Sequence, residues 1–203
     1  MTDAFHTLAR PSAGRVTRSR SRFLAYAFPV SSADEADAHL ERLHREHRDA
    51  SHVCFAYRLC SGDETIEVAD DAGEPAGSAG PPILRRLEGA DLHDVLVVVV
   101  RYFGGTKLGI GGLIRAYGDA TAEALASARV VVRRLEVEVD VTFPPEITSG
   151  VMAVIHRHRA KIRHIEYDAS GTALVALPPS RVATFVDALR EVTGARATAE
   201  VRS

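Results

Sequence analysis

The sequence has few cysteines, no long apolar run and no excess of one charge. Its two cysteines, Cys54 and Cys60, are too far apart for a CxxC site and too few for a disulfide framework, which favours a reducing compartment. No stretch approaches the roughly 18 apolar residues that a membrane span needs, and residues 1–22 lack the apolar region of a signal peptide. A formal net charge of −2 argues against a generally basic nucleic-acid binder. We therefore expect a soluble, cytoplasmic protein that contacts polyanions only through local patches.

Hydrophobic periodicity predicts an α+β chain with two small domains, since 203 residues are ample for two. In the first part, His52 to Leu59 alternates with a period of two and predicts a half-buried strand, whose hairpin partner lies across Ser61–Gly62–Asp63. Asp94 to Val100 is the most apolar run and predicts a central strand buried on both faces. The other elements expected there are helices at 33–49, capped by Ser31 or Ser32, 83–87 and 112–128, and strands at 17–30, 65–68 and 130–132.

The second part of the chain has the order strand, helix, strand, strand, helix, strand. Its strands are expected at 135–141, 161–167, 172–177 and 195–201, and its helices at 144–158 and 180–192. This βαββαβ order is the ferredoxin-like pattern. We place the boundary near Arg134, which gives domains at 1–134, with a core at 18–128, and at 135–203.

The densest cluster of glycines lies in the segment RYFGGTKLGIGGLIRAY, Arg101 to Tyr117. Glycine is costly in regular structure, so a cluster between a strand and a helix indicates positive φ angles or a very close approach. The N–H groups of such a loop, with the start of the helix, suit a phosphate or a carboxylate. Neither a Walker A loop nor a complete G-x-G-x-x-G fingerprint is present, and the alternative is a turn that only packs the helix onto the sheet. The expected anion- or nucleic-acid-binding residues are Arg101, Gly104, Gly105, Lys107, Gly109, Gly111, Gly112 and Arg115.

Three carboxylates, Asp70, Asp71 and Glu74, lie in the turn-rich segment DDAGEPAGSAG. Grouped carboxylates suit Mg²⁺ or Ca²⁺, but this spacing does not match the D-x-[DN]-x-[DN]-G pattern, and acidic turns are usually solvated. We therefore expect no metal and no cofactor. We expect Asp71 and Glu74 to border a cleft, where Glu74 can pair with Arg101.

His52 and Cys54 share one face of a predicted strand and raise the question of a nucleophilic pair. Such a pair needs hydrogen-bond reach, whereas side chains at i and i+2 on a strand are roughly 6–7 Å apart. A catalytic Cys54 is therefore disfavoured. His52 is expected as a polar group that lines the cleft.

Two stretches are rich in basic residues, Arg10 to Arg22 and His156 to His164. Basic clusters on an otherwise neutral protein are typical of phosphate-backbone binding. Aromatic stacking residues are absent from both, so base-specific recognition of a single strand is not supported. Solvated surface charge or pairing between domains is the alternative. The second stretch gives a secondary basic patch of Arg157, Arg159, Lys161 and Arg163.

Four segments together resemble, in order and spacing, the motifs of the IMPACT/YigZ family. They are SRFLAYAFPV at 21–30, SHVCFAY at 51–57, GEPAGSAG at 73–80 and VVVVRYFGGTKLGIGGLIRAY at 97–117. The resemblance spans about residues 18–128, and the βαββαβ pattern after it is similar to the further C-terminal domain of bacterial members. One departure is Ala72, where the family usually has a carboxylate, and this weakens the case for a metal site.

The resemblance implies a fold and a role. The first domain would have the left-handed βαβ fold of a ribosomal small-subunit protein and of the galactokinase-type small-molecule kinases, whose Gly-rich loop binds phosphate. The second would be similar to the last domain of elongation factor G, a module that contacts the ribosome. Eukaryotic relatives regulate translation initiation by competing for a partner of a stress kinase, through an additional domain that we do not expect in this chain.

Together these observations predict an anion-binding protein that binds RNA or the ribosome and regulates translation. The alternative is an enzyme that acts on a small phosphorylated or carboxylated metabolite in the same loop, with Asp71, Glu74 or His52 as acid or base. A third alternative, a protein–protein adaptor, would need an exposed apolar patch that a sequence does not reveal. The sequence establishes no reaction and favours a non-enzymatic role.

Overall fold

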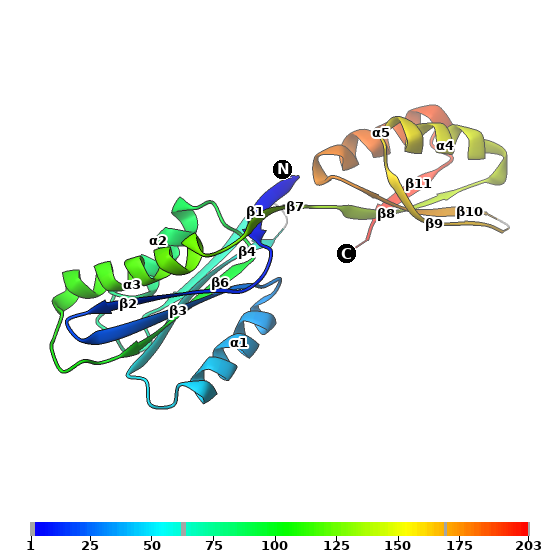
Figure 1. Cartoon of the computed structure of the whole chain (residues 1–203). Helices are drawn as coiled ribbons and strands as arrows, with labels where there is room; N and C mark the ends of the chain where they lie inside the picture. The colour runs from blue at the N-terminus through cyan, green and yellow to red at the C-terminus, as the bar shows by residue number, and fades with distance from the viewer. Residues whose placement is uncertain (1–2, 62–63, 169, 203) are drawn as a thin grey trace. The chain divides into compact units, whose positions relative to one another are not determined.

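A computed structural model describes residues 3–61, 64–168 and 170–202 of the chain (Figure 1). Within these ranges the protein is an α+β chain with five α-helices and antiparallel sheets. It divides into two compact units, residues 5–133 and a second unit that joins 134–203 to residues 1–4. None of the helices described has the length and apolar character needed to cross a membrane.

The first unit is built on a five-stranded antiparallel sheet with the order β2-β3-β6-β4-β5. Its strands are β2 (Ser12–Arg18), β3 (Ser21–Pro29), β4 (His52–Ser61), β5 (Glu64–Asp70) and β6 (Val95–Tyr102). As the run of valines predicts, β6 is the central strand and is buried from Val95 to Arg101. β4 and β5 pair as a hairpin, while its expected turn at 61–63 falls partly outside the described residues.

Helices cover both faces of this sheet (Figure 1). On one face, Leu40 and Leu43 of α1 (Ala33–Glu46) pack in one core with Val98 and Val100. On the other face, α2 (Gly80–Gly89) and α3 (Gly109–Ala126) pack in a second core with Val97 and Val99. The side chains of a strand alternate between the two faces, so β6 serves both cores.

The position of α1 corrects one prediction. The sequence predicted that the strand beginning at His52 is half-buried, but β4 is buried on both faces. Cys54 and Ala56 face α2 and α3, while Val53 and Tyr57 lie in the core that contains α1. The beginning of α1 agrees with the sequence, because the hydroxyl of Ser32 accepts a hydrogen bond from the N–H of Glu35 at 3.2 Å.

The start of the chain also differs from the prediction, which placed the first strand at 17–30. It contains β1 (Ala4–Leu8), which forms a two-stranded sheet with β7 (Val130–Arg134), and β2, which forms a hairpin with β3. β2 has the sequence SAGRVTR, in which Val16 is the one large apolar residue, so the sequence there lacks the apolar alternation by which a half-buried strand is recognised.

The second unit has the predicted βαββαβ order, with two helices on one face of a four-stranded antiparallel sheet of order β11-β8-β10-β9. The elements are β8 (Val137–Phe143), α4 (Thr148–Arg157), β9 (Lys161–Tyr167), β10 (Gly171–Leu177), α5 (Val182–Thr193) and β11 (Thr198–Val201). A short 3-10 helix precedes each α-helix, at Pro145–Ile147 and Pro179–Arg181. Asp3 belongs to this unit and not to the first, because its carboxylate accepts hydrogen bonds from the N–H and hydroxyl of Ser180.

A close contact between helix and strand fixes α3 on the sheet. An added Cβ at Gly14 in β2 would lie 2.3 Å from the backbone nitrogen of Ala124, nearer than any side chain can approach. The hydroxyl of Ser12 donates to the carbonyl of Ala124 at 2.9 Å beside it. Gly14 therefore sets the distance between α3 and β2.

We expect Gly14→Ala to lower the free energy of unfolding by about 1–3 kcal/mol, because the methyl group meets backbone that has to shift. The midpoint of urea unfolding measures this. Gly89→Ala is the matched control: an added Cβ there meets nothing within 4 Å, and it should leave the midpoint unchanged or raise it. Equal midpoints for the two variants would contradict the close contact.

Candidate functional site

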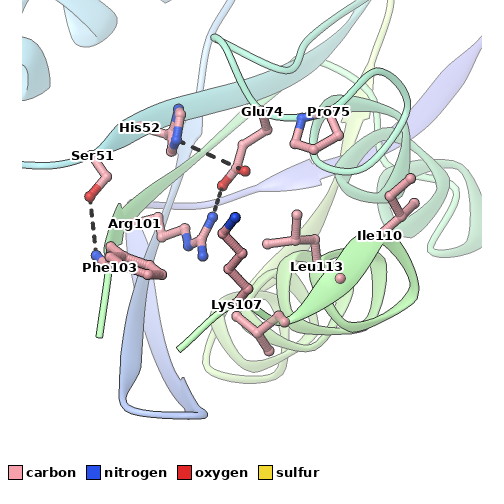
Figure 2. A pocket seen from close by; sticks show the side chains of 11 residues that line it. Ser51, His52, Glu74, Pro75, Arg101, Phe103, Lys107, Ile110 and Leu113 are labelled. Atoms are coloured by element: carbon pink, nitrogen blue, oxygen red, sulfur yellow. Dashed lines mark hydrogen bonds and ion pairs between the residues drawn. The ribbon is translucent and has the colours of Figure 1, made fainter. Parts of the chain in front are cut away.

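A pocket of about 560 Å³ opens on the first unit where β4, β6 and the start of α3 meet (Figure 2). Three groups of residues line it: the start of β4, the acidic loop that follows β5, and the segment from the end of β6 into α3. They are Ser51, His52, Glu74, Pro75, Arg101, Phe103, Lys107, Leu108, Gly109, Ile110 and Leu113. The sequence-predicted His52, Glu74, Arg101, Lys107 and Gly109 are thus brought together.

A buried ion pair lies at the inner side of this pocket. Oε1 of Glu74 accepts a hydrogen bond from Nη1 of Arg101 at 2.6 Å and one from the hydroxyl of Tyr117 at 2.7 Å. The two charged side chains are 2% and 8% exposed, so each depends on the other for its charge to be tolerated inside the protein. The pairing of Glu74 with Arg101 that the sequence suggested is present.

The guanidinium of Arg101 is only partly satisfied by the protein. Among the described residues its hydrogen bond to Glu74 is the one it makes, although a guanidinium carries five N–H donors. Its buried Nε has no acceptor in the described part of the chain. The rings of Phe23 and Phe103 each lie 5.6 Å from its central carbon, which favours the cation without accepting its hydrogens. Arg101 therefore presents positive charge and unused donors at the pocket.

Tyr117 and Cys54 continue the buried network behind Glu74. Sγ of Cys54 lies 3.3 Å from the hydroxyl of Tyr117 and 3.0 Å from the carbonyl oxygen of Asp71. Burial raises the pKa of the Cys54 thiol to about 12, and it also raises the pKa of Tyr117, with Cys54 and Glu74 adding to the effect. Both groups are neutral at pH 7, and Cys54 is a buried, protonated thiol.

His52 stands beside the ion pair. Its Nδ1 donates to the carbonyl oxygen of Ala72 at 3.0 Å, which turns Nε2 toward Oε2 of Glu74 at 3.9 Å. Among the described residues, no hydrogen bond joins His52 to Cys54. The two side chains bond instead to different carbonyl oxygens of the acidic loop, His52 to that of Ala72 and Cys54 to that of Asp71.

Asp71 does not line the pocket, although the sequence placed it at the cleft. Its carboxylate accepts hydrogen bonds from the backbone N–H groups of Gly77, Ala79 and Gly80 at 2.7, 2.7 and 2.9 Å. Partial burial opposes its ionisation, but these N–H groups outweigh that effect and lower the pKa of Asp71. Asp71 therefore organises the loop that presents Glu74. Across the described residues, no group of three or more His, Cys, Asp or Glu side chains converges as metal ligands would.

The five predicted glycines, which lie between the end of β6 and the first turn of α3, serve different structural purposes. An added Cβ at Gly104 would lie 2.0 Å from the carbonyl carbon of Arg20, and its N–H donates to the hydroxyl of Ser21, so Gly104 serves packing. Gly105 and Gly109 have φ angles of +84° and +68°, which favour glycine, and open space surrounds both positions. Of the two remaining predicted glycines, Gly111 also meets open space and Gly112 packs against the side chain of Leu108.

The start of α3 adds positive potential to the pocket. Leu108, at the cap position, provides no side-chain hydrogen bond, and the first turn contains no acidic residue. The first N–H groups of a helix have no partner within it and carry partial positive charge. Lys107 is exposed at this end, whereas the exposed Arg115 lies farther along α3 and does not line the pocket.

The secondary basic patch of the second unit is divided. Lys161 and Arg163 both pair with Glu136, and the hydrogen bond from Lys161 is the main reason that the pKa of Glu136 is lowered. Arg159 and Lys161 line a hollow of about 330 Å³ together with Arg134 and Arg181, which the sequence did not indicate. Arg157 ends α4 and does not line that hollow.

Comparison with known proteins places these residues in a family context. Residues 19–125 match the family model described as the Impact N-terminal domain. The chain is similar to the IMPACT family member YigZ of Escherichia coli (strain K12), with 34% identity over 167 residues, 82% of each chain. It is similar to the IMPACT family member YvyE of Bacillus subtilis (strain 168), with 40% identity over 135 residues, and spans 62% of that relative. A solved structure described as a hypothetical protein matches 100% of this chain and 99% of its own at a TM-score of 0.71 and 29% identity.

We expect Tyr117→Phe to lower the free energy of unfolding by about 1.5–3 kcal/mol, because the buried carboxylate of Glu74 loses one of its two donors. Urea unfolding at pH 7 measures this. Tyr57→Phe makes the same chemical change at a buried tyrosine whose hydroxyl bonds to none of the described residues, so it should be nearly neutral. Equal effects of the two changes would show that the hydrogen bond to Glu74 contributes nothing.

We expect Cys54 to resist thiol reagents in the folded protein. With a pKa of about 12 its thiolate population at pH 8 is about a thousand-fold below that of a free cysteine, and burial slows access further. Labelling of a Cys60→Ser variant, where Cys54 is the remaining thiol, tests this with and without urea. The raised pKa of Cys54 also affects stability. Its contribution to the free energy of unfolding is fully present below pH about 9 and is lost as the pH rises toward 12. Rapid labelling of the folded protein at pH 8 would contradict both statements.

Proposed function

The chain belongs to the IMPACT family, and from this premise we propose that it binds RNA or the ribosome in the cytoplasm and regulates translation. The pocket at the start of α3 is the phosphate-binding site in this proposal. Arg101, Lys107 and the N–H groups of the first turn of α3 hold the anion. Glu74 binds and orients Arg101 from the inner side.

The observation that carries this proposal is the unfinished hydrogen bonding of Arg101. The side chain of Arg101 is 8% exposed, and among the described residues the protein offers its guanidinium one acceptor, Glu74. Phosphate oxygens are strong acceptors for the donors that remain. Glu74 balances the charge of Arg101, so Lys107 and the α3 dipole leave the pocket with an excess of positive charge that selects for anions.

The finer assignment of the fold belongs to the same proposal. In the first unit, β3 and β4 both run antiparallel to β6 between them, and α1 makes the crossover. We assign this unit to the left-handed βαβ superfold of the ribosomal protein and the galactokinase-type kinases. We assign the βαββαβ second unit to the ferredoxin-like class, similar to the last domain of elongation factor G, with the basic residues around Arg159 as a second ribosome contact.

One observation favours the second candidate, an enzyme acting on a small phosphorylated or carboxylated metabolite. The pocket volume of about 560 Å³ is typical of small-molecule sites, and a histidine and a carboxylate stand 3.9 Å apart in it. Since Asp71 is turned into its own loop, His52 and Glu74 are the groups of the predicted acid–base set that face this pocket. A requirement for either in turnover of a small ligand would identify this function.

We expect the protein to bind single-stranded RNA and ribosomes in a salt-dependent way and Lys107→Ala to weaken this about tenfold or more. The reason is the loss of one phosphate contact, which should also reduce the slope of log affinity against log salt by about 0.7. Fluorescence anisotropy with labelled RNA and co-sedimentation with ribosomes measure the two affinities over a salt series.

Arg115→Ala is the matched control for this experiment. It removes one positive charge from α3 at a position outside the pocket, so its effect should be much smaller than that of Lys107→Ala. Equal losses would mean that general charge, and not the pocket, determines binding. If wild-type protein binds neither RNA nor ribosomes at low salt, the proposed function fails and the metabolite enzyme takes its place.

A further inference from the structure

The pocket has an exposed aromatic ring beside its positive charge. Phe103 follows β6 directly, and its side chain is 50% exposed at the pocket (Figure 2). Its backbone N–H donates to the hydroxyl of Ser51 at 3.1 Å, and the central carbon of the Arg101 guanidinium lies 5.6 Å from its ring centre. The Phe103 ring thus lies next to the guanidinium of Arg101 although the ring itself is half exposed and adds little to the hydrophobic core.

Across the pocket from Phe103 is an apolar wall on α3. Ile110 is 58% exposed, and Leu108 and Leu113 line the pocket beside it. Figure 2 shows Phe103 and Ile110 on opposite sides, with the side chain of Lys107 between them. An exposed ring and an exposed aliphatic side chain, with a cation between them, form a surface with two chemical parts.

We propose that the ligand of this pocket is a nucleoside phosphate whose base stacks on Phe103, and this inference rests on the function proposed above. The phosphate lies on Arg101, Lys107 and the first turn of α3. The base lies between the ring of Phe103 and the apolar wall, where it covers the side chains that are now exposed. The pocket thus takes the phosphate and the base together.

Simpler anions would not cover the apolar part of the pocket. Inorganic phosphate or a sugar phosphate satisfies the cations but leaves Phe103 and Ile110 in water. A base in a duplex has both of its faces covered by its neighbours, so stacking on a protein ring requires an unpaired nucleotide. Free nucleotides and single-stranded RNA both provide one.

The experiment compares three ligands of increasing size: inorganic phosphate, ribose 5-phosphate and AMP. Isothermal titration calorimetry with the full chain gives their affinities. We expect AMP to bind about tenfold more tightly than ribose 5-phosphate, the difference being the contribution of one stacked base. Phe103→Leu keeps an apolar side chain and removes the aromatic ring, so it should abolish this difference between AMP and ribose 5-phosphate.

Tyr167→Leu is the matched control, because it removes an aromatic ring that is 58% exposed on β9 of the other unit. It should leave all three affinities unchanged, and urea unfolding should show both variants to be folded. Equal affinities of wild type for AMP and ribose 5-phosphate, or an unchanged preference in Phe103→Leu, would overturn the inference. If RNA binding still depends on Lys107 in that case, the proposed function is retained and only the stacking of a base on Phe103 is rejected. If no anion binds, both fail.

A final arm distinguishes the two sources of the nucleotide. A single-stranded RNA of five nucleotides is titrated beside AMP, again with Phe103→Leu. Tighter binding of the RNA, weakened by the variant, identifies an unpaired nucleotide of an RNA chain. Binding of AMP with exclusion of the RNA identifies a free nucleotide. Each result supports the inference. It is overturned if Phe103→Leu binds the RNA as tightly as wild type does and wild type binds AMP no more tightly than ribose 5-phosphate.

Discussion

The buried ion pair of Glu74 and Arg101 is the interaction on which the first unit and its pocket both depend. Taking two charges out of water costs several kcal/mol for each ion, and only close pairing and further hydrogen bonds offset this. Glu74 comes from a loop, Arg101 from the central strand and Tyr117, the second donor, from α3. These three segments are far apart in the sequence, so one carboxylate fixes their relative positions. The pocket lies where they meet because the charges have to meet there.

The loop before α2 shows how backbone and side chains share this task. Asp71 uses its carboxylate to bind the N–H groups of Gly77, Ala79 and Gly80, which closes the loop on itself. The closed loop directs Glu74 inward, and its Ala72 carbonyl accepts from His52. A carboxylate that organises backbone in this way is indistinguishable in the sequence from one that binds a metal or faces water. The difference lies in the path of the loop backbone, which the pattern of residue types does not reveal.

The same limit explains what the sequence predicted and what it missed. The valines of β6, the Ser32 cap and the pairing of Glu74 with Arg101 follow from local rules or from opposite charge, and all three are present. Tyr117 was missed because it lies at an apolar position of a helix, which predicts a core residue. The residue is indeed buried in the core, and only its hydroxyl belongs to the site. Phe103 was missed because aromatic residues were sought within the basic stretches. It is a fold contact, between the end of β6 and Ser51, that holds it beside the pocket.

Stability and binding are connected through Arg101. A buried donor without an acceptor costs about 1–3 kcal/mol, and the described residues leave Nε of this guanidinium unpaired. Glu74 and two aromatic rings keep the guanidinium in place. In the proposed function, an anion in the pocket accepts from the donors that Glu74 does not use and meets a cation that is already oriented. A fully satisfied arginine would make a more stable protein, but it would have nothing to offer a ligand. In the function proposed above, the incomplete hydrogen bonding of Arg101 is the feature on which binding of the anion depends.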